Sequence, residues 1–186
     1  HQPACGRAPG KVVLLGDRQR VHIGPQADPA ARLRAAAPVD QRGGVQEQGG
    51  RVTNALGWVL ATPPGWWPEV ASDVALERWL LPTVRGELAE CYAITEEYAG
   101  SDVSGMKTTA TKKGDKWVIN GSKCFITNGQ YADWYTVYAK TDKDAGHRGI
   151  SAFVVPRDET VIIDKKEDKL GQRASNTATV VFNETE

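Results

Sequence analysis

Residues 91–129 read CYAITEEYAGSDVSGMKTTATKKGDKWVINGSKCFITNG, and this stretch decides the fold of the chain. Short runs of β-branched and aromatic residues alternate in it with turn residues. Gly114-Asp115 and Asn120-Gly121 read as two-residue connections, and Asn-Gly favours the positive φ angles of a type I′ hairpin. We therefore predict consecutive antiparallel strands, with one hairpin at each connection.

The strand pattern continues to the end of the sequence, with turn residues between nearly all of its runs. Six to eight short strands close most readily into a barrel or sandwich, because closure removes exposed edges. The predicted strands are Cys91 to Ile94, Met106 to Lys113, Lys116 to Ile119, Ser122 to Thr127, Trp134 to Lys140, Gly149 to Val155, Thr160 to Ile163 and Thr177 to Asn183. We predict an α+β fold class, in which a helical N-terminal remnant precedes an antiparallel β-barrel.

Upstream of this region the apolar residues follow a helical repeat. Residues 51–60 predict one helix, and residues 74–81 predict a second that Ser72-Asp73 caps and Pro82 ends. The second helix carries Leu76, Trp79 and Leu80 on one face. Such a stripe indicates packing against a core.

The first 44 residues have a different composition from the rest of the chain. They contain no Phe, Trp, Tyr, Ser or Glu, and Arg, Ala, Gly, Pro and Gln dominate. We interpret residues 1–44 as a disordered or aberrant segment, such as the product of a shifted reading frame or of a junction between two joined sequences. The predicted domains are then 1–44, a helical part at 45–87 and a β-domain at 88–186.

Composition excludes several classes of function. The 186 residues carry 23 Lys plus Arg and 23 Asp plus Glu, so no net positive charge favours nucleic acid or an anionic membrane. No apolar run is long enough for a membrane span. Cys5, Cys91 and Cys124 lie far apart, with no second Cys or His at metal-ligand spacing, so we expect no metal site and no disulfide framework. We expect a soluble protein in a reducing compartment.

The same stretch offers the parts of a flavin site. A flavin ring needs an apolar wall, hydrogen-bonding groups at its polar edge and a separate place for the pyrophosphate. Phe125 supplies a wall, Thr95 and Thr127 supply hydroxyls at strand ends, and Gly100-Ser101 lets backbone amides approach an anion. Each part alone is unspecific, since a Gly-Ser-Asp loop is also a common plain turn. Their order within one short stretch is the stronger signal.

That order, TE-x-x-AGSD followed by NG-x-K, FITNG and then Trp134, resembles the middle β-domain of the acyl-CoA dehydrogenases. Three further segments are similar to the same family: residues 77–87, 148–156 and 165–175. The resemblance covers residues 45–186. It identifies the end of the N-terminal helical domain and the middle β-domain, without the C-terminal helical domain.

The resemblance implies FAD as the cofactor and names the residues that contact it. These are Tyr92, Ala93, Ile94, Thr95, Gly100, Ser101, Phe125, Ile126 and Thr127, and Ser101 also lies near the acyl-CoA substrate. It further implies oxidation of an acyl-CoA to the 2,3-enoyl-CoA in the intact family member. The expected partners are an electron-transfer flavoprotein as acceptor and further copies in a homo-oligomer. The expected location is the bacterial cytoplasm or the mitochondrial matrix.

Two departures from the family pattern lie among residues 92–101 and 125–127. Phe125 stands where the family most often has Trp, and Glu97-Tyr98 stands where it has Pro-Gly, which places a carboxylate beside the expected pyrophosphate. The family's catalytic base belongs to the C-terminal helical domain. We therefore assign no catalytic residue and expect no dehydrogenase turnover from residues 1–186 alone.

Two other functions fit the same residues. In one, the β-domain is a non-catalytic scaffold that holds no cofactor, because half of the family's flavin contacts come from elsewhere. In the other, the fold serves a flavin monooxygenase or oxidase of the same superfamily. Retention of flavin separates the first from the main hypothesis, and oxygen uptake with a substrate that is not a CoA ester separates the second.

Overall fold

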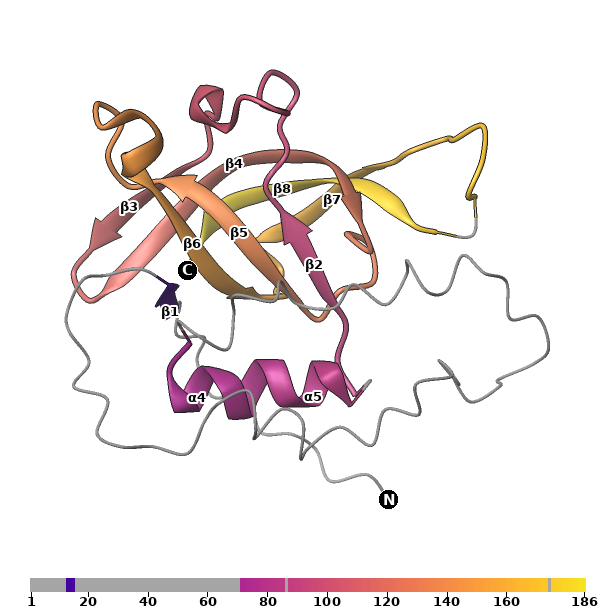
Figure 1. Ribbon diagram of the computed structural model, residues 1–186, viewed down its shortest axis with the longest axis horizontal. Helices are drawn as coiled ribbons and strands as arrows, with labels where there is room; N and C mark the ends of the chain where they lie inside the picture. Colours follow the sequence, from indigo (N-terminus) through magenta and orange to yellow (C-terminus); the bar gives the residue numbers. More distant parts are fainter. Residues whose placement is uncertain (1–12, 16–70, 86, 174) are drawn as a thin grey trace.

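The computed structural model describes residues 13–15, 71–85, 87–173 and 175–186 (Figure 1). The predicted helix at residues 51–60 and most of the segment 1–44 lie outside the described residues. Within that segment, Val13–Leu15 form strand β1, which pairs antiparallel with a strand of the main sheet.

One curled sheet of eight strands makes up most of the described chain. The strand order is β1-β6-β5-β3-β4-β8-β7, and β2 also pairs with β5. The strands are β1 (Val13–Leu15), β2 (Glu90–Ala93), β3 (Thr109–Lys113), β4 (Lys116–Thr127), β5 (Trp134–Lys140), β6 (Ile150–Pro156), β7 (Val161–Lys166) and β8 (Thr177–Thr185). The predicted strand-rich domain is thus present.

The sheet differs from the predicted antiparallel barrel in two respects. It is mixed, because β2 and the start of β3 pair parallel with β5, while the remaining pairs are antiparallel. It is also open, since its strand order runs from β1 to β7 without pairing these two ends within the described residues. Parallel neighbours need a long crossover connection, and the β3–β4 hairpin provides it between β2 and β5. The sequence pattern locates strands, but it does not show which strands lie side by side.

The second predicted hairpin, at Asn120-Gly121, is wrong. The hairpin at Gly114-Asp115 is present, with Gly114 at φ 63° and Lys113 opposite Lys116. At Gly121, however, β4 continues, and its register against β8 shifts there as in a β-bulge. Gly121 has φ 154°, and a Cβ built on it would lie 2.7 Å from the Cα of Thr108. The glycine serves a close approach of two backbones rather than a turn.

The predicted helix at residues 74–81 is confirmed, but it is longer. Three short elements, α4 (Asp73–Ala75), η1 (Leu76–Leu80) and α5 (Leu81–Val84), form one continuous helical stretch. Ser72 caps it, since its Oγ accepts from the Ala75 N–H at 3.3 Å. Pro82 does not end it: η1 is a π-turn in which the Leu81 N–H bonds the Leu76 carbonyl, and Pro82, which has no N–H to donate, lies in the first turn of α5 that follows. Among all the residues that the structure describes, no helix is long and apolar enough to cross a membrane.

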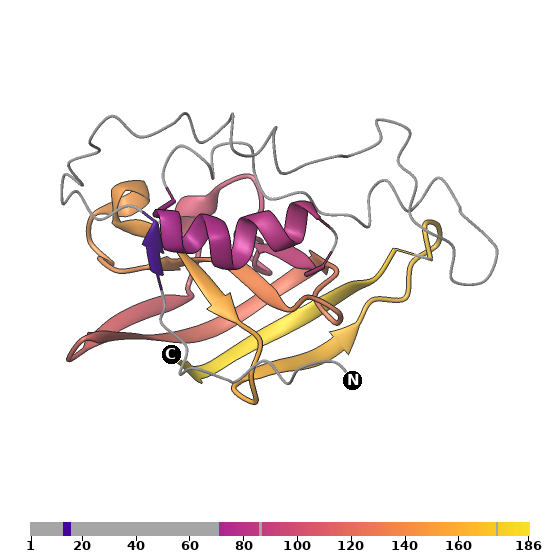
Figure 2. The same cartoon turned by 90° about the horizontal axis from the view of Figure 1, so that it is seen from below.

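The helix covers one face of the sheet (Figure 2). Leu76, Trp79 and Leu80 are buried, as their stripe predicted, and they pack against Trp134 of β5. The indole N–H of Trp134 also donates to the Thr83 hydroxyl at 2.9 Å. Burial of each large apolar side chain contributes about 1.5–3 kcal/mol, so this stripe is sufficient to hold the helix on the sheet.

The opposite face of the sheet carries the main core. Side chains alternate along β5, so Trp134 and Tyr138 face the helix while Tyr135 and Val137 face this core. The ring of Tyr135 meets that of Phe182 edge to face, with centroids 5.8 Å apart. One strand therefore contributes to two separate clusters.

A buried carboxyl group lies on the β2 side of the helix-facing layer. Glu90 is 1% exposed, and its Oε1 accepts from the Thr136 hydroxyl at 2.7 Å. Its Oε2 has no hydrogen-bond partner among the described residues. Burial raises the pKa of Glu90 to about 7, and the Thr136 hydrogen bond offsets only part of this rise. The folded chain therefore favours the protonated form of Glu90.

We expect Glu90→Gln to remove a pH dependence of stability. In the folded chain Glu90 keeps its proton up to about pH 7, whereas in the unfolded chain it releases it near 4.5. Between these values the folded state binds more protons, so stability falls as pH rises. The loss reaches about 3 kcal/mol above pH 7. Urea unfolding at pH 5 and pH 8 should show most of this loss in the wild type and none of it in the variant. The exposed Glu159→Gln serves as control, and an unchanged pH difference in Glu90→Gln would contradict the assignment.

Candidate functional site

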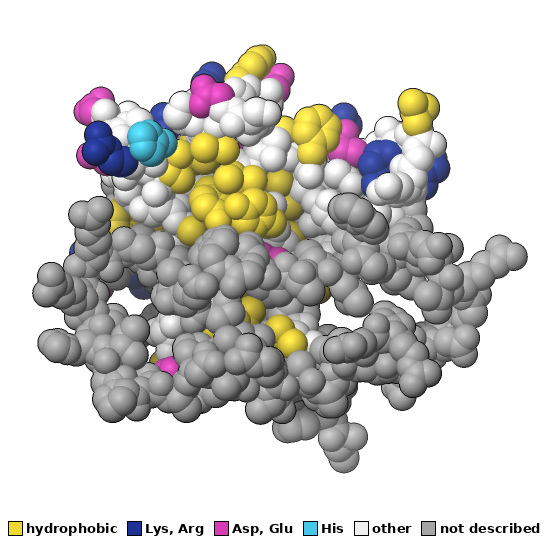
Figure 3. All heavy atoms as spheres, viewed as in Figure 1, with side chains coloured by type: hydrophobic (Ala, Val, Ile, Leu, Met, Phe, Trp, Pro, Cys, Tyr) yellow, Lys and Arg dark blue, Asp and Glu magenta, His cyan; other side chains and the backbone are white. Residues whose placement is uncertain are grey.

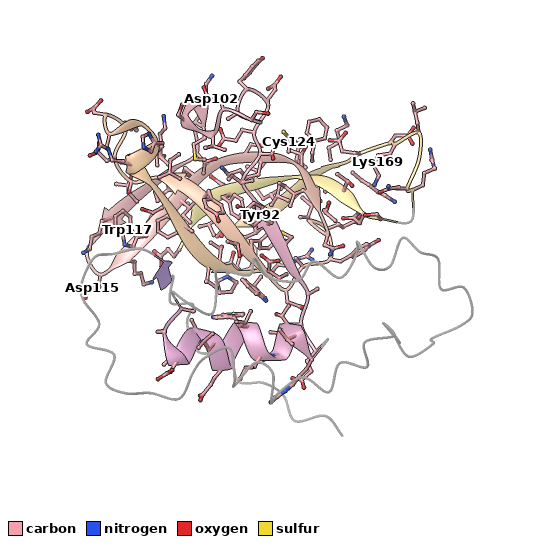
Figure 4. All side chains as sticks on the ribbon, in the orientation of Figure 1. Tyr92, Asp102, Asp115, Trp117, Cys124 and Lys169 are labelled. Carbon is pink, nitrogen blue, oxygen red and sulfur yellow. The ribbon has the colours of Figure 1, made fainter. Side chains whose placement is uncertain are left out.

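The two blocks that the sequence singled out meet where β2 ends beside β4. The backbone N–H of Cys124 donates to the carbonyl of Thr95 at 2.9 Å. Cys124 and Asp102 both lie on the upper side of the view in Figure 4, whereas Asp115, at the turn between β3 and β4, lies on the lower left. Block one is residues 92–101 and block two is residues 125–127. They form one continuous site region.

Phe125 is presented to solvent by a bulge in β4. The register against β8 shifts between Lys123 and Ile126, and both of these side chains are buried. Phe125 lies between them with φ 56° and is 65% exposed. A positive φ at an aromatic residue is uncommon, and such strain is typical of sites with a function. The exposed ring is available as a flat apolar wall.

The predicted cofactor residues fall into two groups by accessibility. Tyr92, Gly100, Ser101 and Phe125 are exposed, and Ile94, Thr95 and Thr127 are half-buried. The side chains of Ala93 and Ile126 belong to the main core, so only their backbone could meet a ligand. Figure 3 shows an apolar patch on the face of the sheet that this view presents.

The segment between β2 and β3 is a series of tight turns. Glu96 and Ala99 exchange two backbone hydrogen bonds of 3.1 Å, which presents Glu97 and Tyr98 at the turn. Asp102 begins η2 (Val103–Gly105), and its Oδ1 accepts from the Ser104 N–H at 3.0 Å. This is the plain Asp turn that the sequence allowed. Between the turns, nothing lies within 4 Å of a Cβ built on Gly100, so its backbone faces open space.

A buried ion pair that sequence reasoning missed lies below these turns. Lys123 is 0% exposed, and its Nζ lies 2.8 Å from Glu96 Oε1 and 3.2 Å from the Ile94 carbonyl. Glu96 also accepts from the backbone N–H groups of Lys107, at 2.6 Å, and Thr108, at 3.0 Å. Block one is thus tied to β4 and to the start of β3 through one carboxylate.

The electrostatics favour a charged pair. Burial raises the pKa of Glu96, but the hydrogen bonds from Lys107, Lys123 and Thr108 outweigh it, so the net pKa lies below its usual value. Burial lowers the pKa of Lys123, and Glu96 partly offsets this. Because its carboxylate already accepts three hydrogen bonds, Glu96 does not fit the role of a catalytic base.

One signal in the sequence could have revealed Lys123. In an unbroken strand, residues 119, 121 and 123 lie on the same side, which the buried Ile119 marks as inward. A lysine at such a position needs a carboxylate partner. The mistaken hairpin at Asn120-Gly121 divided this strand and hid the pattern.

The surroundings of Cys124 are acidic. Burial raises the pKa of its thiol, and the carboxylates of Glu167, Glu97 and Glu96 raise it further. A thiol in such surroundings is a poor nucleophile, since the thiolate is the reactive form. Glu167 lies beside block two, because its backbone N–H donates to the Thr177 carbonyl and Thr177 pairs with Thr127, and its carboxylate would repel an anion there.

A shallow pocket of about 230 Å³ lies in the connection from β7 to β8, beside block two, because Thr177 at the start of β8 pairs with Thr127. Its lining residues are Lys166, Glu167, Asp168, Lys169, Arg173 and Ser175. Lys169 donates to the Ser175 carbonyl at 2.6 Å and to the Thr177 hydroxyl at 2.9 Å, so it fixes the connection itself. Among the described residues, no group of three or more His, Cys, Asp or Glu side chains could hold a metal ion.

A curled mixed sheet thus brings the two blocks of exposed aromatic and backbone groups together at one edge. The family model described as "Acyl-CoA dehydrogenase, middle domain" matches residues 91–185. The chain belongs to the acyl-CoA dehydrogenase family.

Known proteins similar to this chain are consistent with that family. The mitochondrial short-chain specific acyl-CoA dehydrogenase of Rattus norvegicus is 43% identical over 109 residues, which cover 58% of this chain and 26% of that protein. The structure of butyryl-CoA dehydrogenase from Megasphaera elsdenii matches with TM-score 0.64 and 40% identity, over 68% of this chain and 33% of that one. A structure described as an electron transferring flavoprotein of Acidaminococcus fermentans matches with TM-score 0.60 and 42% identity, over 62% and 30%. The matched residues thus span about a quarter to a third of these proteins.

Proposed function

We propose that this chain supplies the flavin-facing and substrate-facing sheet of an FAD-dependent acyl-CoA dehydrogenase. The observation that carries the proposal is the junction of the two blocks, in which Cys124 N–H bonds the Thr95 carbonyl beside the bulge that exposes Phe125. In the whole enzyme the reaction is oxidation of an acyl-CoA to the 2,3-enoyl-CoA, with an electron-transfer flavoprotein as acceptor and a homo-oligomer as the working form.

The residues present fit a flavin. Phe125 offers a ring that is 65% exposed. Half-buried hydroxyls are offered by Thr127, two residues further along β4, and by Thr95, whose carbonyl accepts from the N–H of Cys124 just before Phe125. Open space in front of Gly100 leaves room for a phosphate against the backbone amides of residues 100–101. The flavin supplies the hydride chemistry when bound, while these residues hold and orient it. None of the described carboxylates is assigned the role of base.

The direct test is to add FAD to the purified 186-residue chain, remove the excess and record the visible spectrum. Retained flavin bands with quenched fluorescence are expected. A chain that remains folded and colourless would instead favour the non-catalytic scaffold, for which the exposed carboxylate of Glu97, three residues before Gly100, is the specific observation.

We expect Gly100→Ala to weaken FAD binding without affecting the fold. A Cβ at this position meets nothing within 4 Å, so no clash arises in the protein itself. The methyl group would occupy the space that a phosphate needs, and we expect at least a tenfold higher Kd by flavin fluorescence quenching. Gly171→Ala, where a Cβ likewise meets nothing, serves as the matched control. Equal affinity of the two variants would place the phosphate elsewhere.

A further inference from the structure

The ion pair of Lys123 and Glu96 is not used by the function proposed above. Its geometry connects places that are far apart in sequence. Glu96 starts the loop 96–108, and its carboxylate accepts the backbone N–H groups of Lys107 and Thr108 at the end of that loop. The same carboxylate receives Lys123 of β4 at 2.8 Å. One carboxylate therefore closes the loop and fixes it to the sheet.

The interior of this loop is held by local contacts. Its turns are formed by the Glu96–Ala99 backbone pair and by the hydrogen bonds from Gly105 and Ser104 to Asp102. Gly100 lies between these turns and is exposed. Local turns define the shape of the loop, but they do not fix its place relative to β4. That placement depends on the ties made by Glu96.

We propose that Lys123 and Glu96 are positioning residues, which hold the backbone of Gly100 and Ser101 at the place where a cofactor phosphate binds. This inference rests on the proposed flavin function. Lys123 acts on both sides of Thr95, since it binds the Ile94 carbonyl before it and the Glu96 carboxylate after it. Neither residue needs to touch the cofactor.

A purely structural role makes a different prediction. If the pair only filled the interior, neutral side chains of similar volume would replace it, because a buried ion pair is often no more stabilising than well-packed neutral groups. The double variant Glu96→Gln/Lys123→Met provides such a replacement. The glutamine amide of this variant has only one acceptor oxygen. It therefore cannot accept from the N–H groups of Lys107 and Thr108 through two oxygens, as the Glu96 carboxylate does.

The test is hydrogen exchange of the full 186-residue chain, read by mass spectrometry. In the double variant, peptides from residues 97–106 should exchange at least tenfold faster, while those from β4 and β5 stay within twofold of the wild type. FAD affinity should fall at least tenfold. Glu96→Gln alone leaves the buried Lys123 ammonium without its counter-charge, so it should loosen the loop and also lower the stability of the whole chain below that of the double variant. The matched control is Glu184→Gln/Lys113→Met, which removes an exposed ion pair of 2.8 Å at the other end of β4.

Three results would overturn the inference. One is a loop that exchanges as slowly as in the wild type, another is an equal loss of protection in loop and sheet, and the third is unchanged FAD affinity despite a loosened loop. If the wild type binds no FAD, the proposed function fails, and the exchange data still decide whether the pair orders the loop. If the wild type binds FAD and the double variant binds it equally well, the function stands and the positioning role fails.

Discussion

Replacement of Lys123 by methionine should lower the free energy of unfolding by about 3–5 kcal/mol. The ammonium group is fully buried and lies 2.8 Å from Glu96, whose side chain is only 9% exposed. Methionine fills a similar volume but leaves the carboxylate without its counter-charge. The Lys107 and Thr108 N–H groups still bind Glu96, and they offset only part of the cost of the unpaired charge. Because a domain is stable by about 5–15 kcal/mol, this single change should remove much of the stability.

Urea unfolding followed by tryptophan fluorescence measures this effect. In the double variant Glu96→Gln/Lys123→Met, which has no unpaired charge, most of the loss should be recovered. The control is Lys113→Met, where the ammonium is 60% exposed and its pair with Glu184 is worth at most about 1 kcal/mol. A loss below about 1 kcal/mol in Lys123→Met would show that Glu96 reaches water and that the pair is not a buried one.

The second large effect is expected from Gly121→Ala, with a loss of about 4 kcal/mol. Two terms add here. A non-glycine residue at φ 154° is strained by about 1–3 kcal/mol, and its Cβ would lie 2.7 Å from the Cα of Thr108, where only a shift of backbone relieves the contact. Thr108 also donates its backbone N–H to Glu96, so the same shift would disturb the ion-pair site.

The control for this variant is Gly100→Ala, since a Cβ there meets nothing within 4 Å. Both variants add one methyl group to a glycine, so their difference isolates the close approach of Gly121 to Thr108. Thermal or urea unfolding should give near wild-type stability for Gly100→Ala. Similar stability of both variants would mean that β3 and β4 separate at this point without cost.

Local chemistry in the sequence predicted most of the elements. The Gly114-Asp115 hairpin, the Ser72 cap and the Leu76 stripe follow from turn propensity, capping and periodicity, and all three are present. Each depends on residues within about one turn of each other. The family resemblance was confirmed in the same way, because its motifs are short and contiguous.

What the sequence did not reveal depends on distant partners. Asn120-Gly121 has the composition of a turn, but Thr108 and β8 select an extended strand with a bulge instead. Pro82 is a residue that commonly ends a helix, but here the helix continues through it as α5 after a π-turn. The parallel pairing of β2 with β5 and the pair Lys123–Glu96 join residues many positions apart. Such contacts follow from the tertiary fold, so no local pattern encodes them.

The alternation along β5 limits how this chain can change in length. Trp134 and Tyr138 pack toward the helix, and Tyr135 and Val137 pack toward the main core. An insertion of one residue within β5 would exchange these two sets between the faces and disrupt both clusters at once. Additional or missing residues are instead tolerated where the backbone turns back on itself, as between β5 and β6, where Thr141 and Asp142 bond the Gly149 carbonyl and close the connection at its base. Variation in length among proteins of this kind should therefore concentrate in such connections, while β5 keeps its seven residues.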